Sequence, residues 1–321
     1  MVGCEWISPG SEMVCSRRPF VNPRVAIVLV NYNRAADTIA CVRSLQLCTY
    51  AGLQILLIDN GSTDDSIAVI RGALADVPCH ATGRNLGFTG GCNFALTVMG
   101  DDQPRYLVLL NNDTLVEPGF LEPLVDAMER DPSIGAAGGT ICYHPDIERV
   151  WYAGGNFSYL RGSGFSWGYG RLLEELPDRS SAEVTFISGC LLMTRMSIVR
   201  DIGLLDDRFC MYLEDAELCL RLLSRGHRLV WVRNSRIFHK VHHAGNKPLP
   251  LYFSVRNRLL LLRLRVTGWR RYAGMGYVLL TTIIKIIPWA ITRPDLMRAA
   301  RAAIADFMKG RFFEGRGFSV R

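Results

Sequence analysis

Apolar runs typical of buried strands alternate with segments of helical periodicity through the first 143 residues. The runs are short, rich in β-branched residues and apolar on both faces, as strands covered by helices on both sides are. Strands and helices that alternate at this spacing form right-handed βαβ units. The sequence therefore predicts an α/β fold with a mostly parallel sheet. The predicted strands are 24–31, 53–59, 78–82, 105–110 and 134–143, and the predicted helices are 37–47, 63–74, 89–99 and 117–130.

The pattern changes after residue 145. Residues 151–169 are dense in Gly, Ser and aromatic residues, which favours hairpins and loops. Strand and helix signals then return, and one helix ends before Gly226, a residue type common just after a helix. The predicted elements are strands at 184–193 and 227–232, a helix at 215–224, a basic helix at 251–265 and an apolar stretch at 274–291.

Charge separates the chain into two parts. The net charge is +7, but residues 251–321 contain 14 Lys and Arg against 3 Asp and Glu, whereas residues 1–250 contain 23 against 27. Because the basic part is also apolar, a membrane surface suits it better than nucleic acid does. We predict a leader over 1–23, an α/β domain over 24–245 and a basic helical C-terminal region over 246–321.

Composition places the chain among ordinary globular proteins, with 49% apolar and 21% charged residues, and excludes a disordered chain. The 10 cysteines include no C-x-x-C pair, so reduced thiols in a cytosolic protein are expected. No apolar run of signal-peptide length occurs in residues 1–22. We expect a cytoplasmic protein.

Polar residues follow three of the predicted strands, at the edge where open α/β sheets bind ligands. Asn31-Tyr32-Asn33 follows the first strand, Asp59 ends the second, and Asn111-Asn112-Asp113 follows the fourth. The Asp59 carboxylate can accept the imide N–H of uracil or thymine, or it can cap a turn. Tyr32 can stack on a base or simply pack. Asp113 is a good Mg²⁺ or Mn²⁺ ligand beside a diphosphate, or part of an Asx-rich turn.

Residues 84–93 (RNLGFTGGCN) form a Gly-rich segment that runs into a helix. Gly87 allows close approach of backbone to a ligand, and a helix N-terminus favours phosphate. The segment matches neither G-x-G-x-x-G nor a Walker loop. It is either a phosphate-binding loop or an ordinary Gly-rich turn.

Glu214 and Asp215 stand at the start of a predicted helix. Asp215 can act as a general base toward a sugar hydroxyl, or the two acids can complement the helix dipole. His239, His242 and His243 lie close together after a strand, where one can bind a metal or all three can be solvated.

Taken in order, the motifs VNYN, IDNGSTD, RNLGFTGGCN, LLNNDT, SGCLLM, YLEDAELCLRL, HK and RNRLLLL resemble inverting glycosyltransferases of family 2. The chain is most similar to the branch that contains bacterial rhamnosyltransferases, and the resemblance covers roughly residues 24–265. It implies the GT-A fold, in which a mostly parallel nucleotide-binding sheet merges with a smaller acceptor-side sheet.

The resemblance also implies roles for individual residues. Tyr32 and Asp59 match positions that hold the nucleotide base, and Asp215 matches the catalytic base. In the metal motif, Asn111 stands where the family often has Asp, so metal affinity is expected to be lower. The implied donor-binding residues are Asn31, Tyr32, Asp59, Asn85, Gly87, Asn111 and Asn112; the metal ligands are Asp113 and His239; and the acceptor side has Gly189, Cys190 and Glu214.

The function implied is inverting transfer of a sugar from a nucleotide-diphosphate sugar to a glycan or polyprenyl-linked saccharide in cell-surface polysaccharide synthesis. The donor is expected to be dTDP-rhamnose or a UDP-hexose, with Mg²⁺ or Mn²⁺ as cofactor. A sugar-phosphate nucleotidyltransferase is the alternative enzyme, but it usually carries a Gly-rich loop after the first strand, where this chain has Asn31-Tyr32-Asn33-Arg34. A non-catalytic carbohydrate-binding protein would not need acids at both a strand end and a helix start.

The apolar stretch 275–291 is 17 residues long and contains Lys285 and Pro288. A bilayer span needs about 20 apolar residues, and a central Lys opposes insertion. Basic and aromatic residues flank the stretch, as in helices that lie in the plane of an anionic membrane surface. We predict a peripheral anchor on the cytoplasmic face of the inner membrane, with a true span and a buried core helix as alternatives.

Overall fold

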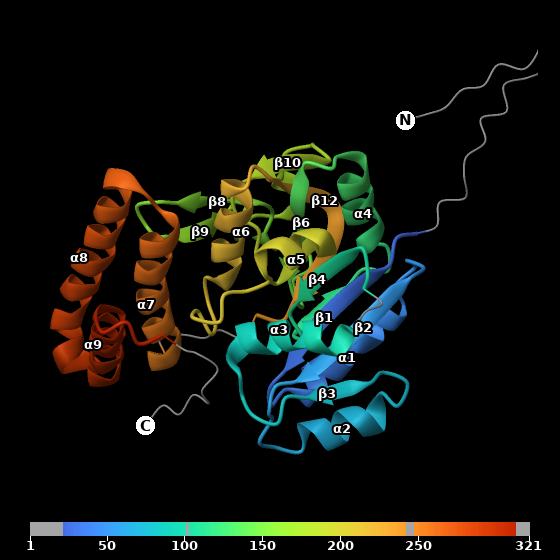
Figure 1. Ribbon diagram of the computed structural model, residues 1–321, viewed down its shortest axis with the longest axis horizontal. Coiled ribbons are helices and arrows are strands. Elements are labelled where there is room, and N and C mark those ends of the chain that lie inside the picture. Colours follow the sequence, from blue (N-terminus) through green and yellow to red (C-terminus); the bar gives the residue numbers. More distant parts are fainter. Residues whose placement is uncertain (1–21, 101–102, 242–246, 313–321) are drawn as a thin grey trace, which may run out of the picture.

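The structure, a computed structural model, describes residues 22–100, 103–241 and 247–312. Its first half contains four parallel strands that lie side by side in the order β4, β1, β2, β3 (Figure 1). This arrangement confirms the predicted parallel sheet. The strands are β1 (Val25–Asn31), β2 (Leu53–Asp59), β3 (Cys79–Ala81) and β4 (Tyr106–Leu110), and the helices that connect or follow them are α1 (Ala35–Gln46), α2 (Ser66–Ala73), α3 (Gly87–Met99) and α4 (Leu121–Arg130).

Helices cover this sheet because their apolar residues recur with helical spacing. In α1, Thr38, Cys41, Val42 and Leu45 are buried, which is one face of a helix. In α3, Gly91 lies so close to β1 that a Cβ atom would be 2.8 Å from the side chain of Val30. Glycine at that position therefore lets α3 approach the end of β1.

The second half continues the same sheet with mixed strand directions. β11 (Leu191–Arg195) runs antiparallel to both β4 and β6 (Ile134–Tyr143) and so joins the two halves. β12 (Arg228–His239) lies parallel to β6. The remaining elements are β5 (Thr114–Val116), β7 (Val150–Tyr152), β10 (Ser181–Val184), the hairpin β8 (Gly155–Ser158) and β9 (Ser163–Ser166), the 3₁₀ turn η1 (Leu173–Glu175), α5 (Met196–Ile202) and α6 (Glu214–Ser224).

The C-terminal helices gather at the end of the molecule far from β3 (Figure 1). They are α7 (Pro248–Arg265), α8 (Gly268–Thr292) and α9 (Pro294–Met308). Their apolar residues share one cluster with α6, which includes Leu220, Leu260, Val278 and Phe307. The predicted boundary at residue 245 lies outside the described residues and stays a prediction. Helix α7, which follows it, packs on α6, which precedes it.

Several predicted boundaries were wrong. The strand predicted at 184–193 is two strands, because β10 ends at Val184 and β11 begins at Leu191, with a loop between them. The strand predicted at 227–232 extends to His239, because β12 pairs with β6 beyond a bulge and then with β5. Helices α5 and α9 were not predicted. Residues 1–21 of the leader predicted over 1–23, and His242 and His243, lie outside the described residues.

Candidate functional site

The ends of β1 and β2 bring Asn31 and Asp59 together, since the two residues are partners in the parallel register. Asp59 is 2% exposed. Its Oδ1 accepts hydrogen bonds from Asn31 Nδ2 at 2.8 Å and from Ser62 Oγ at 2.6 Å, and its Oδ2 accepts one from the Ser62 backbone N–H at 3.1 Å. The carboxylate is therefore held in one orientation. Asn31 is fully buried and positions Asp59. That Asn31 itself contacts the nucleotide-sugar substrate stays a prediction.

The Gly-rich segment is held against the end of β2 by Asn60, which the sequence analysis missed. The Asn60 side chain is buried and donates to the Gly87 carbonyl at 2.9 Å, while its Oδ1 accepts from the Leu86 N–H at 3.0 Å. Asn85 caps the same turn, since its Oδ1 accepts from the Gly87 N–H at 2.8 Å. Gly87 has a positive φ of 74°, and a Cβ there would be 2.5 Å from the sulfur of Cys210. Only glycine fits that position.

Thr38 of α1 links the end of β1 to the segment after β4. Its hydroxyl donates to Asn31 Oδ1 at 2.8 Å and accepts from Asn112 Nδ2 at 2.8 Å. Tyr32 stands at the same edge and is 41% exposed, so its ring is open to a ligand. The three strand ends thus form one connected polar edge, as the sequence predicted.

Asp113 and His239 lie side by side, with His239 Nε2 3.1 Å from Asp113 Oδ1. Strand β12 places His239 there by pairing it with Thr114 of β5. Apart from this close approach, which is not a hydrogen bond of good geometry, the buried atoms Asp113 Oδ1 and His239 Nδ1 have no hydrogen-bond partner within the described residues. Such atoms are costly unless a ligand satisfies them.

These two side chains fit a divalent ion. Among the described residues no group of three or more His, Cys, Asp and Glu side chains could hold an ion alone. The protein would therefore supply two ligands, and diphosphate oxygens and water would supply the others, as is usual for Mg²⁺. The backbone of Asn111 fixes the position of this segment. Its N–H donates to the Cys190 carbonyl at 3.2 Å, and its carbonyl accepts from Thr114 Oγ1 at 2.7 Å.

Asp215 is fixed at the start of α6 by two backbone N–H groups. Its Oδ2 accepts from Gly189 at 2.9 Å, and its Oδ1 accepts from Ala216 at 2.7 Å. A Cβ at Gly189 would be 3.2 Å from the Cβ of Asp215, so the loop can approach this closely because residue 189 is glycine. Burial raises the pKa of Asp215, and the two N–H groups oppose that shift.

Glu214 is buried next to Asp215, and its Oε2 has no hydrogen-bond partner among the described residues. Burial, and then the charge of Asp215, raise the pKa of Glu214. The pair therefore favours a protonated Glu214 beside an ionised Asp215, which is the protonation state a general base needs. Cys190 is buried too, and burial raises the pKa of its thiol well above the usual value, which excludes a thiolate nucleophile.

The segment before α6 holds a strained backbone that the sequence analysis did not predict. Cys210, Tyr212 and Leu213 have positive φ values of 65°, 65° and 70°. Such conformations cost about 1–3 kcal/mol each in non-glycine residues and persist only when the surroundings impose them. Here α7 imposes them. Asn257 Nδ2 lies 2.8–2.9 Å from the carbonyls of Phe209, Met211 and Tyr212.

Arg256 makes further hydrogen bonds to the same segment, so that Arg256 and Asn257 together clamp it. Its Nη2 donates to the carbonyls of Arg208 at 2.9 Å and Phe209 at 3.0 Å, and its Nε donates to Asn257 Oδ1 at 2.9 Å. Arg256 is 2% exposed and Asn257 is fully buried. The signal in the sequence was three adjacent polar residues, Arg256, Asn257 and Arg258, inside the run FSVRNRLLLL, because polar side chains buried in an apolar run need partners.

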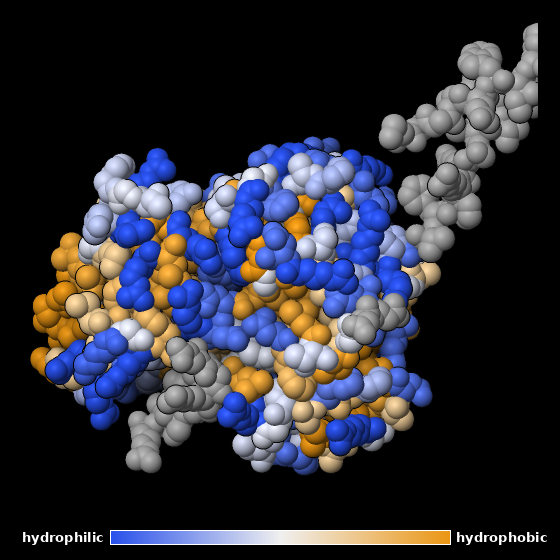
Figure 2. Space-filling model, in the orientation of Figure 1, coloured by the Kyte–Doolittle hydropathy of each residue, from blue (hydrophilic) through white to orange (hydrophobic). Residues whose placement is uncertain are grey.

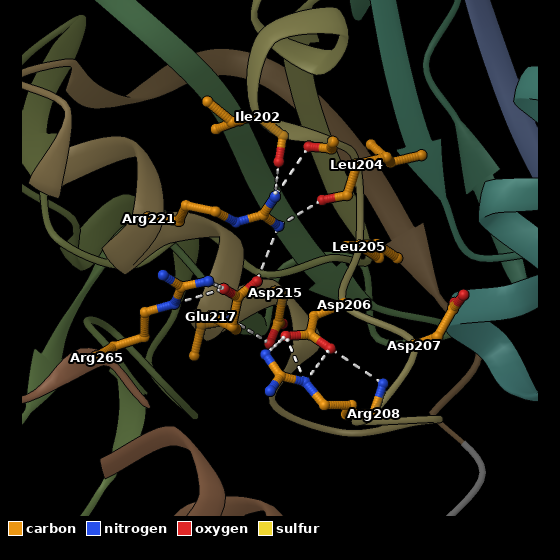
Figure 3. A network of polar contacts seen from close by, with 12 residues as sticks. Ile202, Leu204, Leu205, Asp206, Asp207, Arg208, Asp215, Glu217, Arg221 and Arg265 are labelled. Carbon is orange, nitrogen blue, oxygen red and sulfur yellow. Dashed lines mark hydrogen bonds and ion pairs between the residues drawn. The ribbon is translucent and has the colours of Figure 1, made fainter. Parts of the chain in front are cut away.

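An ion-pair network ties α6 to its neighbours (Figure 3). Glu217 is fully buried between Arg221, at 2.8 Å, and Arg265 of α7, at 2.7 Å. Arg221 also donates to the carbonyls of Ile202 and Leu204 at 2.6 Å and 2.7 Å. Moving α6 away from α7 would leave a buried charge without its partner, which strongly destabilises a protein. The network therefore holds the two helices in one relative position.

Replacing Asn257 by Ala is expected to lower kcat by ~10- to 100-fold, because small displacements of a catalytic group are costly and Asn257 fixes the segment that leads to Asp215. The measurement is kcat with the melting temperature recorded in parallel. Asn156→Ala is the matched control, since Asn156 lies on β8 and contacts Thr185, not the 208–213 segment. A folded Asn257→Ala protein with wild-type kcat would contradict this role.

Comparison with known proteins identifies the family. The model of Glycosyl transferase family 2 matches residues 26–203. The N-acetylglucosaminyl-diphospho-decaprenol L-rhamnosyltransferase of Mycobacterium tuberculosis is 29% identical over 265 residues, which cover 76% of this chain and 86% of that protein. The glucosyl-dolichyl phosphate glucuronosyltransferase of Haloferax volcanii is 22% identical over 223 residues, 68% of this chain and 69% of that protein.

Solved structures show the same fold. A mannosyltransferase from Pyrobaculum calidifontis, in complex with GDP-Man and Mn²⁺, superposes with a TM-score of 0.59 at 13% identity, over 91% of this chain and 89% of that chain. GalNAc-T7 with UDP, GalNAc and Mn²⁺ superposes with a TM-score of 0.58 at 16% identity, over 90% and 56%. The predicted GT-A fold is confirmed. The chain belongs to glycosyl transferase family 2 and is a glycosyltransferase.

Proposed function

We propose that this glycosyltransferase moves a sugar from a nucleotide-diphosphate sugar to a lipid-linked saccharide in a single inverting displacement, with Asp215 as general base. One observation carries the proposal. The Gly189 N–H donates a hydrogen bond to Asp215, and the carbonyl of the next residue, Cys190, accepts one from the N–H of Asn111 in the metal motif. Two adjacent residues therefore contact both the base and the metal motif. A base close to the donor diphosphate is what attack on the anomeric carbon requires.

The donor lies along the strand ends. Asp59 accepts the imide N–H of uracil or thymine, and Tyr32 stacks on the base. The Asn85–Gly87 turn contacts the ribose and diphosphate. Asp113 and His239 would hold Mg²⁺ or Mn²⁺, and the ion would supply positive charge beside the diphosphate. The Mn²⁺ in both solved structures supports a divalent ion.

The acceptor follows from the Mycobacterium tuberculosis relative, whose name gives an N-acetylglucosaminyl-diphospho-decaprenol acceptor and a rhamnosyl product. A related lipid-linked N-acetylglucosamine and dTDP-rhamnose are therefore the first substrates to test here. UDP-hexoses are the second class of donor. The acceptor side contains Gly189, Cys190 and Glu214.

The test is a donor screen. Purified full-length protein is incubated with each nucleotide sugar and an N-acetylglucosaminyl-diphospho-lipid, and nucleoside diphosphate release is measured with and without the acceptor. Acceptor-dependent release from dTDP-rhamnose, with inverted anomeric configuration in the product by NMR, is expected. Retained configuration would reject single displacement, and pyrophosphate release from a sugar phosphate and nucleoside triphosphate would favour a nucleotidyltransferase.

We also propose that α8 attaches the protein to the cytoplasmic face of the inner membrane. Helix α8 is long and apolar enough to cross a membrane, but it packs one side on α7 and α9. Its opposite side is an exposed apolar surface, visible at the edge of the molecule in Figure 2. This surface, the α8 apolar face, consists of Leu280, Ile283, Ile284, Ile287 and Ile291.

The spacing of the α8 apolar face follows one side of a helix, which suits a helix lying in the membrane plane. Trp269 and Tyr272 are 75% and 72% exposed near the start of α8 and can lie at the level of the headgroups. Exposed basic residues nearby, such as Arg301, favour anionic lipid.

Replacing both Ile284 and Ile287 by Glu is expected to lower binding to anionic vesicles by more than ~10-fold, because two apolar side chains leave the bilayer and two negative charges enter. Co-sedimentation with vesicles measures it. Leu47→Glu is the control, since Leu47 is 72% exposed at the end of α1. Unchanged binding of the double variant would reject α8 as the anchor, and resistance of membrane-bound protein to alkaline carbonate extraction would favour a span.

A further inference from the structure

A cavity of about 670 Å³ lies among the β8–β9 hairpin, α7, α8 and the strained segment before α6. Its lining includes Arg161 from the hairpin turn, Arg258 from α7 and Lys285 from α8. Tyr212 and Leu213 line it as well. We call it the basic cavity. None of the side chains proposed above to bind the nucleotide or the metal ion belongs to it.

Among the residues that the structure describes, the three cations have no acid to neutralise them. No carboxylate lines the basic cavity, and none of the three forms an ion pair in the part of the chain that the structure describes. Arg258 Nε donates to the backbone carbonyl of Arg161 at 2.5 Å, which holds the two arginines near each other. Burial lowers the pKa of Arg258, Tyr277 partly opposes that shift, and the charge of Arg161 adds to it. An anion would relieve both effects.

The chemistry of the lining fits a diphosphate. Guanidinium groups and an ammonium bind phosphate oxygens through charge-assisted hydrogen bonds. Hydroxyl groups of Tyr212, Ser254 and Tyr277 lie around the same space and can donate to further oxygens. The volume lies within the usual range for small-molecule sites, about 300–1,000 Å³.

The position of the basic cavity connects it to the reaction and to the membrane. Leu213 lines the cavity, and Asp215 follows two residues later, so their Cα atoms are less than about 8 Å apart. On α8, Tyr277, Thr281 and Lys285 line the cavity at intervals of four residues, and the α8 apolar face lies on the adjoining side of the same helix. A molecule in the basic cavity can therefore extend toward the base at one end and toward the lipid at the other.

We infer that the basic cavity binds the diphosphate of the lipid-linked acceptor and holds its sugar beside Asp215, with the lipid chain leaving along α8. This inference rests on the proposed function for the identity of the acceptor. An anionic phospholipid headgroup presents related phosphate chemistry, and the experiment separates the two.

The experiment measures binding of farnesyl diphosphate, a short polyprenyl diphosphate without a sugar, to the full-length protein in neutral detergent micelles. Arg258→Gln and Lys285→Gln are each expected to weaken binding ~10- to 100-fold, since each removes a charged hydrogen-bond donor. Lys285 is exposed, so its variant tests the inference even where Arg258→Gln is unstable. Arg43→Gln, an exposed site on α1 outside the cavity, carries the same charge change and is expected to bind as wild type does.

Three results would overturn the inference. The first is that both cavity variants bind farnesyl diphosphate as tightly as wild type does. The second is that phosphatidylglycerol at equal concentration displaces farnesyl diphosphate. The third is that a nucleoside diphosphate competes with farnesyl diphosphate for the protein at equal concentration. In steady state, Lys285→Gln is expected to raise KM for the lipid-linked acceptor ~10-fold or more and to leave KM for the donor unchanged.

Failure of the proposed function gives a different result. If wild-type protein binds farnesyl diphosphate through Arg258 and Lys285 but transfers no sugar to a lipid-linked saccharide, the proposed acceptor is wrong and the cavity still binds a lipid diphosphate. If transfer occurs and neither variant changes acceptor KM, the proposed function stands and the cavity assignment is wrong.

Discussion

Replacing Asp215 by Asn is expected to lower kcat by ~10²–10⁴-fold, the usual cost of losing a general base. The substitution keeps the size of the side chain and its oxygen acceptor for the Gly189 N–H, but the amide cannot take a proton. Burial raises the pKa of Asp215, so the wild-type rate should fall at low pH through a pKa above the ordinary value for Asp. Stopped assays of nucleoside diphosphate release across pH, with circular dichroism to confirm folding, measure both effects.

Glu214→Gln is the matched control for that variant. The raised pKa of Glu214 keeps its side chain protonated, and a protonated carboxyl resembles an amide in size and charge. Glu214→Gln is therefore expected to retain most of the activity that Asp215→Asn loses. If Asp215→Asn kept the wild-type kcat, Asp215 would have a structural role only. That role would be in the first turn of α6, where Leu213 is the N-cap residue.

Removing Asp113 is expected to lower metal-dependent donor binding and turnover by ~10²–10³-fold, since a Lewis-acid metal contributes several kcal/mol to such reactions. His239→Ala is expected to have a smaller effect, because a neutral ligand is lost and the carboxylate remains. Calorimetric titration of nucleoside diphosphate with and without Mn²⁺ measures the enhancement directly. It needs no turnover, so it separates metal binding from the chemistry of Asp215.

Asp131→Ala is the control for Asp113→Ala, because Asp131 is partly exposed and pairs with Arg228, far from the strand ends that carry the polar edge. Asn111→Asp is expected to increase the Mn²⁺ enhancement, since it restores a carboxylate at the start of the metal motif. Equal enhancement in wild type and Asp113→Ala would exclude Asp113 as a ligand.

Much of the polar edge could be predicted from residue order alone. Each parallel strand ends where its apolar run ends, and parallel strands end at one edge, so Asn31, Asp59 and Asp113 had to lie near one another. The family resemblance added the expected role of Asp215. The structure then showed how these side chains are held, through Thr38 and Asn60, whose contacts depend on helix and loop positions that periodicity does not report.

The exposed side of α8 was also predictable in part. Its length, its Lys285 and its flanking aromatic residues favoured a helix at a membrane surface. Which side faces outward depended on how α8 packs, with Gly274, Val278 and Thr282 buried against the neighbouring helices. The basic cavity depended on packing as well, because Arg161, Arg258 and Lys285 come from three elements that tertiary structure alone brings together.

By itself, the sequence determined the α/β class, a mostly parallel sheet and the residue types at each strand end, because these follow from hydrophobic periodicity and local turn chemistry. Only the tertiary structure decided that the predicted strand at 184–193 breaks around Gly189 and that β12 runs on to His239. It also decided that Asn257 clamps the strained segment before Asp215. Each of these features depends on a partner distant in the chain, and no local pattern carries the position of that partner.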